Sequence, residues 1–136
     1  MSTPFRSRAQ LKSILYVDDE PDIREVVQMS LSLLGDVEVH ACESGEQALV
    51  LLPSLRPDLV MLDVMMPRMD GPTTLTRMRA DSAFARIPVI FMTAKALPQE
   101  IARFREMGAV AVIPKPFDPL QLGTQVVTIW EGLPHA

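Results

Sequence analysis

Residues 59–67 read Leu59-Val60-Met61-Leu62-Asp63-Val64-Met65-Met66-Pro67, and they carry the strongest sequence signal for the fold class. Four apolar residues bounded by turn signals indicate a strand that is buried on both faces, as in a parallel sheet. The carboxylate of Asp63 stands directly at the end of this strand. An ionised carboxylate beside a buried strand is costly unless its charge is compensated. Asp63 is therefore either paired for a structural reason or held in place for chemistry.

On both sides of this stretch, strand-like and helix-like segments alternate. Further short apolar segments lie at 13–17, 37–41, 88–92 and 110–113. Helix-start signals are found at Pro21, at Ser44 with Gln47, at Asp70 with Gly71 and Pro72, at Pro98, and at Asp118 with Pro119. Pro53 and Pro57 are assigned to the loop before the third strand. Five such β-α units predict an α/β fold, with a parallel sheet covered by helices on both faces.

The bulk composition narrows the class of protein. The 136 residues suffice for one domain with a sizeable core. The net charge of −4 and the pI near 5.1 give no support for a nucleic-acid-binding surface. The single cysteine, Cys42, excludes an intrachain disulfide and favours a reducing compartment. No segment reaches the ~20 apolar residues of a transmembrane helix. We expect a cytoplasmic protein with no membrane and no nucleic-acid partner.

Polar and charged residues follow the apolar strands. Asp18 and Asp19 come after the first strand, Asp63 after the third, Thr93 after the fourth and Lys115 after the fifth. In open α/β sheets the ligand site lies beyond the carboxyl ends of the strands. We therefore expect three carboxylates, a hydroxyl and an ammonium to converge at one end of the sheet.

This set of side chains suits phosphoryl chemistry. Three nearby carboxylates repel one another, and a hard divalent cation such as Mg²⁺ relieves that repulsion. Lys115 supplies a positive charge suited to a phosphoryl oxygen, and Thr93 supplies a hydroxyl donor. Asp63 is then placed to act as a nucleophile and form an aspartyl phosphate.

The ordered motifs carry a family resemblance. They are Asp18-Asp19, Leu62-Asp63-Val64-Met65-Met66-Pro67 with Met69-Asp70-Gly71, Thr93-Ala94, and Lys115-Pro116-Phe117. The chain resembles the receiver domain of a bacterial two-component response regulator, of the stand-alone kind found in chemotaxis. The resemblance covers about residues 12–131. It implies a doubly wound, flavodoxin-like (βα)5 sandwich with strand order 2-1-3-4-5.

The resemblance also implies a metal and a phosphoryl donor. Asp63 would accept a phosphoryl group from a sensor histidine kinase or a histidine phosphotransfer protein. Asp18, Asp19 and Asp63 would hold Mg²⁺ together with the backbone carbonyl of Met65. The chain would not be an enzyme beyond catalysing its own phosphotransfer and dephosphorylation.

The resemblance implies only part of the conformational switch by which family members respond to phosphorylation. Thr93, Ala94 and Lys115 would bind the phosphoryl group, and the peptide before Pro116 would be cis. Family members usually carry an aromatic residue three positions before the lysine, and here that position is Val112. A valine cannot swing between exposed and buried rotamers. We therefore expect phosphorylation to reorder the loop 94–97 through Thr93, with the signal carried by its backbone and by Lys95.

Domain boundaries and rival functions complete the expectations. We expect a flexible N-terminal segment at 1–11, a receiver domain at 12–131 and a short tail at 132–136. If the sequence is complete, output must come from docking on an unknown downstream protein. Rival readings are a phosphate sink or phosphorelay intermediate, a fragment of a hybrid kinase or larger regulator, and a metal-dependent phosphatase. The phosphatase is disfavoured because such enzymes usually place two acidic residues two positions apart after the first strand, whereas Asp18 and Asp19 are adjacent.

Overall fold

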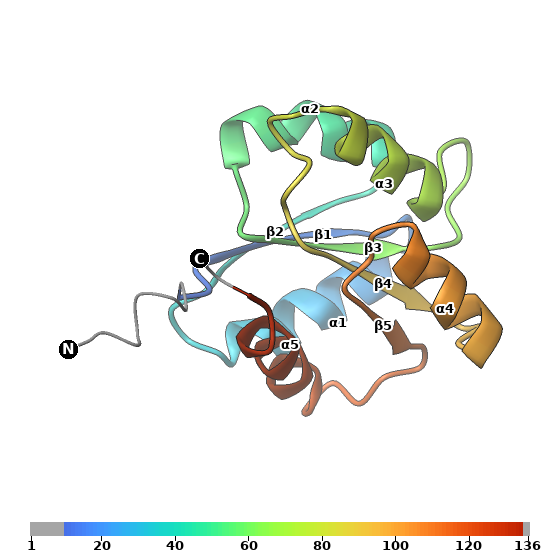
Figure 1. Ribbon diagram of the computed structural model, residues 1–136. Coiled ribbons are helices and arrows are strands. Elements are labelled where there is room, and N and C mark those ends of the chain that lie inside the picture. Colours follow the sequence, from blue (N-terminus) through green and yellow to red (C-terminus); the bar gives the residue numbers. More distant parts are fainter. Residues whose placement is uncertain (1–9, 135–136) are drawn as a thin grey trace.

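The structure is a computed structural model that describes residues 10–134. Strands and helices alternate along this range (Figure 1). The elements in order are β1 (Ser13–Val17), α1 (Pro21–Ser32), β2 (Glu38–Cys42), α2 (Gly45–Leu55), β3 (Leu59–Asp63), α3 (Gly71–Ala80), β4 (Val89–Thr93), α4 (Pro98–Glu106), β5 (Ala111–Pro114) and α5 (Leu122–Glu131). No helix of the described part is long and apolar enough to cross a membrane.

All strand pairs are parallel, and the sheet has the order β2-β1-β3-β4-β5. The predicted doubly wound (βα)5 fold and its strand order are therefore confirmed. β3 and β4 are buried at every position, as expected for central strands covered on both faces. The apolar run of residues 59–62 thus identifies the middle of the sheet correctly.

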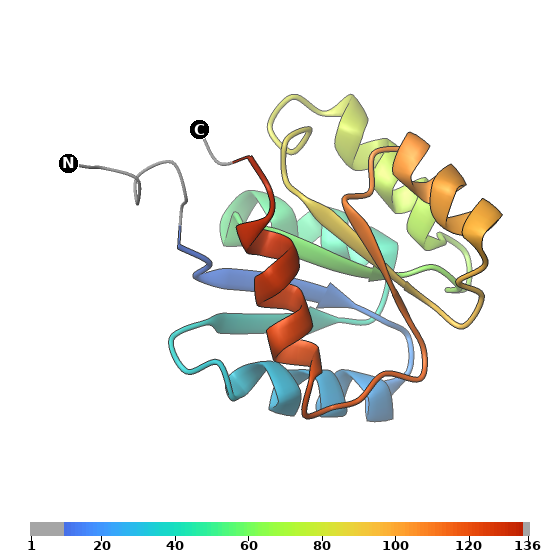
Figure 2. The same cartoon turned by 60° about the horizontal axis from the view of Figure 1, so that its bottom comes forward.

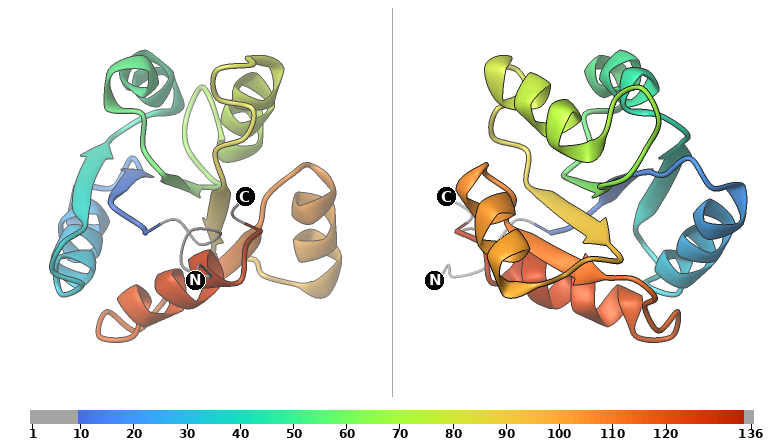
Figure 3. Two further views of the ribbon diagram at one scale, coloured as in Figure 1. Left: turned by 60° about the vertical axis from the view of Figure 1, so that its left-hand side comes forward. Right: turned by 90° about the vertical axis from the view of Figure 1, so that its right-hand side faces the viewer.

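The helices form one layer on each face of the sheet (Figures 2 and 3). Alternate strand residues point to opposite faces, which divides the core into two clusters. One cluster packs under α2, α3 and α4 and includes Leu52, Leu75 and Phe104. The other packs under α1 and α5 and includes Leu31 and Trp130. Both clusters bury large side chains, so neither helix layer is peripheral to the fold.

Two helix boundaries differ from the sequence expectation. Pro53 was assigned to a loop but lies inside α2. A proline removes the hydrogen bond to the carbonyl four residues earlier, but Pro53 is exposed, so water can satisfy that carbonyl. Leu52 is fully buried and keeps the helix attached to the sheet. The prediction of a loop at Pro53 was therefore wrong, because packing outweighs the proline signal.

The last helix begins later than expected. Asp118 and Pro119 were predicted to cap and start it, but α5 begins at Leu122. The Asp118 carboxylate accepts a hydrogen bond from the backbone N–H of Leu120 at 2.9 Å, which closes a turn before the helix. An aspartate followed by proline suits a turn as well as a helix cap. The predicted helix end near Trp130 agrees with the observed end at Glu131.

The predicted outer segments of the chain are described only in part. Of the expected flexible segment 1–11 and tail 132–136, residues 1–9 and 135–136 lie outside the described residues. Leu11, at the inner edge of that N-terminal segment, is buried in the core under α1 and α5. The predicted domain boundaries at residues 12 and 131 stay predictions.

Candidate functional site

The carboxyl ends of four adjacent strands meet at one edge of the sheet. Asp63 is the last residue of β3 and pairs in register with Met92 of β4, while Thr93 pairs with Pro114 of β5. Asp18 follows β1, which lies next to β3. The predicted convergence of Asp18, Asp63, Thr93 and Lys115 follows from this strand order. Gly71 allows the close approach of α3, because a Cβ there would lie 2.6 Å from the Asp63 carbonyl oxygen.

Asp18 is the most enclosed charged residue of the site. It is fully buried, and its Oδ1 accepts a hydrogen bond from the backbone N–H of Glu20 at 3.0 Å. Its Oδ2 accepts two more, from the Tyr16 hydroxyl at 2.5 Å and from the Lys115 ammonium at 3.0 Å. The Arg24 guanidinium donates to the Asp18 backbone carbonyl at 2.7 Å. Both the carboxylate and the backbone of Asp18 are therefore held in place.

Lys115 joins two strands across the site. Its Nζ donates to Asp18 Oδ2 and to Asp63 Oδ1, each at 3.0 Å. The Asp63 side chain is only 6% exposed and that of Lys115 16%, so solvent screens these ion pairs little. Among the described residues, no donor bonds Asp63 Oδ2. The two carboxylate oxygens of Asp63 therefore differ, because Lys115 bonds only Oδ1.

Three carboxylates form a site that fits a divalent cation. One oxygen each of Asp18, Asp19 and Asp63 lie within 4.8 Å of one another. Three carboxylates against the single ammonium of Lys115 leave an excess of two negative charges at the cluster. Oxygen ligands at this separation and charge suit Mg²⁺, which keeps several waters and needs few protein ligands. Asp19 is more exposed than the other two and would face the entering ion.

The charges of the site shift one another's pKa values. Burial raises the pKa of Asp63 to about 6, with Asp18 and Asp19 adding to the rise and Lys115 opposing it. Burial lowers the pKa of Lys115, but its hydrogen bonds to Asp18 and Asp63 outweigh this and leave the pKa raised. At neutral pH, Lys115 is therefore an ammonium and Asp63 is mainly a carboxylate of increased basicity, which favours nucleophilic attack.

Thr93 lies at the end of β4 with its hydroxyl turned to the following loop. The side chain is buried, and its Oγ1 accepts a hydrogen bond from the backbone N–H of Lys95 at 3.0 Å. The Thr93 carbonyl accepts a hydrogen bond from the Lys115 N–H at 2.8 Å, which ties the ends of β4 and β5 together. Ala94 and Lys115 line the same cavity of about 310 Å³. The Lys115–Pro116 peptide is cis, as the resemblance implied.

Two residues named from the sequence lie apart from the ion pairs. Met65, two residues after Asp63, has an exposed side chain, and its carbonyl as a metal ligand stays a prediction. Val112 pairs in register with Phe91 and packs on the core cluster that contains Phe104. Phe91 and Phe104 contact each other edge to face, with ring centroids 4.9 Å apart. Aromatic packing in this region is therefore supplied by β4 and α4 rather than by β5.

The sequence reasoning missed Tyr16. It was treated as one more apolar residue of the first strand, yet its hydroxyl reaches the site. A signal was available, because Tyr16 and Asp18 are two residues apart and side chains at that spacing share a strand face. The hydrogen bond from Arg24 of α1 to the Asp18 carbonyl has no comparable signal in the sequence, because it depends on where the helix packs.

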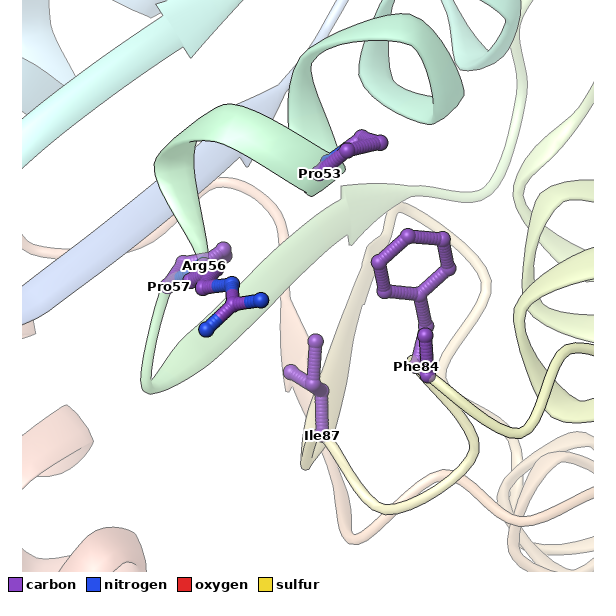
Figure 4. A pocket seen from close by; sticks show the side chains of 6 residues that line it. Pro53, Arg56, Pro57, Phe84 and Ile87 are labelled. Carbon is purple, nitrogen blue, oxygen red and sulfur yellow. The ribbon is translucent and has the colours of Figure 1, made fainter.

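A second hollow lies at the opposite edge of the sheet (Figure 4). It has a volume of about 450 Å³ and is lined by Pro53, Arg56, Pro57, Ala83, Phe84 and Ile87. Its lining residues come from the end of α2 and from the segment before β4, and Arg56 is the only charged one. No partner group faces that guanidinium among the described residues. The lining of this hollow therefore contains none of the clustered acids found at the carboxyl edge.

Comparison with known proteins agrees with the geometry. The family model of the response regulator receiver domain matches residues 14–127. The chain is 39% identical over 110 residues to the response regulator Rre1 of Synechocystis sp., covering 81% of this chain and 48% of that protein. It is 37% identical over 111 residues to the phosphate regulon transcriptional regulatory protein PhoB of Pseudomonas aeruginosa, covering 82% of this chain and 48% of that protein. The chain thus spans about half the length of these relatives.

A solved structure with the same fold is known. The chemotaxis response regulator CheY4 of Vibrio cholerae superimposes with a TM-score of 0.81 at 28% sequence identity. The match covers 88% of this chain and 99% of that one. The strand order and the layers of helices therefore agree with a structure in which this fold makes up almost the entire chain.

Proposed function

The chain belongs to the response regulator receiver domain family, and on this premise we propose that Asp63 accepts a phosphoryl group and that the phosphorylated form signals by binding a partner protein. The observation that carries the proposal is the Asp63 carboxylate, which is bonded to Lys115 through one oxygen and has no donor from residues 10–134 on the other. The donor would be a sensor histidine kinase or a histidine phosphotransfer protein. The family is not a classical enzyme family, so catalysis here would be limited to the chain's own phosphoryl group.

The chemistry would be an in-line phosphoryl transfer. Asp63 Oδ2 attacks the phosphorus of a phosphohistidine, so that a P–O bond forms and the P–N bond breaks. The imidazole leaves with the electron pair of that bond and takes a proton from solvent. The raised pKa of Asp63 supports this role, because a more basic carboxylate is a stronger nucleophile.

The remaining side chains would bind and orient the group. Asp18, Asp19 and Asp63 fit Mg²⁺, which when bound supplies positive charge for the oxygens of the transferring group. The Lys115 ammonium would release Asp18 and pair with a phosphoryl oxygen. The Thr93 hydroxyl would donate to another. These three roles leave out Tyr16 and Arg24, which both bond Asp18.

A change at Thr93 would loosen the loop that follows β4. In the present conformation its Oγ1 accepts the N–H of Lys95, and a rotation toward a phosphoryl oxygen would break that bond. α4, next along the chain, buries only one side chain, Phe104. Family members usually carry an aromatic residue at the position of Val112. We propose that the weak attachment of α4 takes the place of the rotation of that aromatic side chain. Output would then pass through the backbone of residues 94–97 and through Lys95.

The phosphoacceptor is tested by one substitution. Asp63→Asn should abolish labelling by acetyl phosphate with Mg²⁺, measured as the mass increase of one phosphoryl group. Asp70→Asn is the matched control, because Asp70 caps α3 through the N–H of Thr73 and asparagine caps a helix as well as aspartate does. Undiminished labelling of the Asp63→Asn chain would remove the central assignment.

The switch is tested separately from the chemistry. Amide spectra across residues 93–99 should change on phosphorylation of the wild-type chain and should not change in Asp63→Asn. If labelling occurs but these amides stay in place, Asp63 remains the acceptor and the loop does not carry the signal.

A binding experiment distinguishes a phosphorylation-dependent switch from a phosphate sink. A protein captured only by the phosphorylated chain supports the switch, whereas fast transfer to and from a kinase with no such capture supports the sink or relay. The relatives include proteins named as transcriptional regulators, one of them DNA-binding. For this chain, the absence of a nucleic-acid partner stays a proposal that concerns these 136 residues only.

A further inference from the structure

Tyr16 is a buried polar residue that the phosphoryl chemistry leaves without a role. Its side chain is fully buried in the core under α1 and α5, and its hydroxyl donates to Asp18 Oδ2 at 2.5 Å. It is the only tyrosine of the chain. A phenylalanine would fill the same space, so the hydroxyl itself requires an explanation.

The strand geometry makes this contact reach the site. Tyr16 lies in β1 two residues before Asp18, so both side chains leave the strand on the same face. β1 lies between β2 and β3, and the phenol ring is fully buried in the core cluster under α1 and α5. Burial and the neighbouring Asp18 raise the pKa of the Tyr16 phenol, which therefore stays a neutral donor. Tyr16 thus bonds Asp18 without adding charge to the cluster.

Lys115 and Tyr16 share one acceptor atom but differ in what happens to them during the reaction. Both donate to Asp18 Oδ2. The proposed function moves the Lys115 ammonium to the phosphoryl group, which takes one donor away from a fully buried carboxylate. The phenol cannot follow, because its ring is enclosed in the core. Tyr16 is the donor that remains when Lys115 leaves.

We propose that Tyr16 is a positioning residue, which holds the Asp18 carboxylate oriented toward the metal site independently of Lys115. The inference rests on the proposed function and deepens it. Removing a partner that orients a metal-binding side chain typically lowers the metal affinity by roughly 10–100-fold. Because Tyr16 and Lys115 bond the same oxygen, their contributions should not be additive.

The test measures Mg²⁺ affinity of the full unphosphorylated chain by calorimetry in a two-by-two set of variants. Tyr16→Phe alone should weaken binding by about threefold or less, because Lys115 still holds Asp18. Lys115→Met alone should tighten binding, because a competing cation is gone. Tyr16→Phe in the Lys115→Met background should weaken binding by about tenfold or more. An equal or smaller effect in that background overturns the inference.

A control separates positioning from general loss of a buried hydroxyl. Thr74→Val removes a buried hydroxyl that donates to the Asp70 carbonyl at 2.9 Å, at the start of α3, and should leave Mg²⁺ affinity unchanged. If wild type binds Mg²⁺ and the two Tyr16→Phe effects are equal, only the inference fails. If wild type does not bind Mg²⁺, the inference and the metal part of the proposed function fail together.

A spectroscopic measurement needs no change at Tyr16. In protein with ¹³C at the ζ carbon of tyrosine, the single signal should keep its hydrogen-bonded position when Mg²⁺ is added and when Lys115 is replaced by Met. It should move in Asp18→Asn. A signal that leaves its position on addition of Mg²⁺ would show that Tyr16 releases Asp18 and would overturn the inference.

Discussion

The two edges of this one sheet differ in what their polar groups do. At the carboxyl edge, the buried carboxylates of Asp18 and Asp63 both accept hydrogen bonds from the half-buried ammonium of Lys115. At the amino edge, Asp58 accepts the backbone N–H groups of Lys12 and Ser13 and so joins β3 to β1. The carboxyl edge therefore holds an excess of negative charge, whereas the carboxylate at the amino edge is used to bond backbone N–H groups.

This difference indicates that residues at the amino edge stabilise the fold, whereas residues at the carboxyl edge form the candidate site. Arg79, at the end of α3, donates to the carbonyls of Ile87 and Gly108, the first before β4 and the second before β5. It pairs with no carboxylate among the described residues, so its charge serves the connections between elements. Substitutions at the amino edge should therefore change stability alone, and those at the carboxyl edge should change metal and phosphoryl binding.

The largest effect on stability is expected at the amino edge. Arg79→Met should lower the free energy of unfolding by about 3 kcal/mol, because two partly buried carbonyls lose charged donors. Urea unfolding measures this loss, and Mg²⁺ affinity should not change. Arg77→Met, on the exposed side of the same helix, is the control and should be nearly neutral. A fall in Mg²⁺ affinity in Arg79→Met would show that the two edges are coupled.

The second effect is a pH dependence that belongs to the carboxyl edge. Burial raises the pKa of Asp63 from 3.8 to about 6, so the folded state binds this proton more tightly than the unfolded state. The stabilising contribution is full below about pH 4 and is lost as the pH rises to about 6. Without Mg²⁺, wild type should lose on the order of 2 kcal/mol relative to Asp63→Asn over that range.

Addition of Mg²⁺ checks the cause of that loss. Above pH 6 the ion should restore stability to wild type, because it binds the charged carboxylates of the folded state. Unfolding free energies of wild type and Asp63→Asn that run parallel from pH 4 to pH 6 would contradict the assignment of the raised pKa to Asp63.

The third effect is a loss of metal affinity without a loss of stability. Asp19→Asn should weaken Mg²⁺ binding by about tenfold, because one of three carboxylates becomes a neutral amide. Its unfolding free energy should stay equal or rise, since like-charge repulsion falls. Asp22→Asn, an exposed acid in the first turn of α1, serves as the control. Equal losses of affinity in both variants would point to a diffuse negative field rather than a site.

The smallest effect compares one backbone position at each edge. Arg56 and Arg68 both adopt positive φ, at 45° and 67°, which glycine tolerates better. Arg56→Gly, at the end of α2, should raise the free energy of unfolding by about 0.5–1 kcal/mol. Arg68→Gly should gain less, because it also loses the ion pair with Glu46 at 3.4 Å. Thermal unfolding of the two variants in parallel would reveal the difference.

Local sequence signals predicted the strands well and the helix ends less well. Ser44 accepts the N–H of Gln47, as its capping pattern indicated, and Asp70 caps α3. Pro53 was misassigned because a proline's missing N–H is harmless on an exposed helix side, and exposure is set by packing. Asp118 was misassigned because a turn and a helix cap use the same carboxylate geometry.

The amino-acid sequence was sufficient to predict the fold class, and it indicated Asp63 as the residue that we propose as the phosphoacceptor. Short continuous apolar runs and helix-start residues are local properties, and the rule that sites lie beyond parallel strand ends needs only the strand limits. The hydrogen bonds among Asp18, Asp63, Lys115 and Tyr16 became visible in the folded structure. It brings Lys115, 97 residues from Asp18, onto the same oxygen as Tyr16. Hydrogen bonds between strands depend on packing distance and direction, and neither is encoded by spacing along the chain.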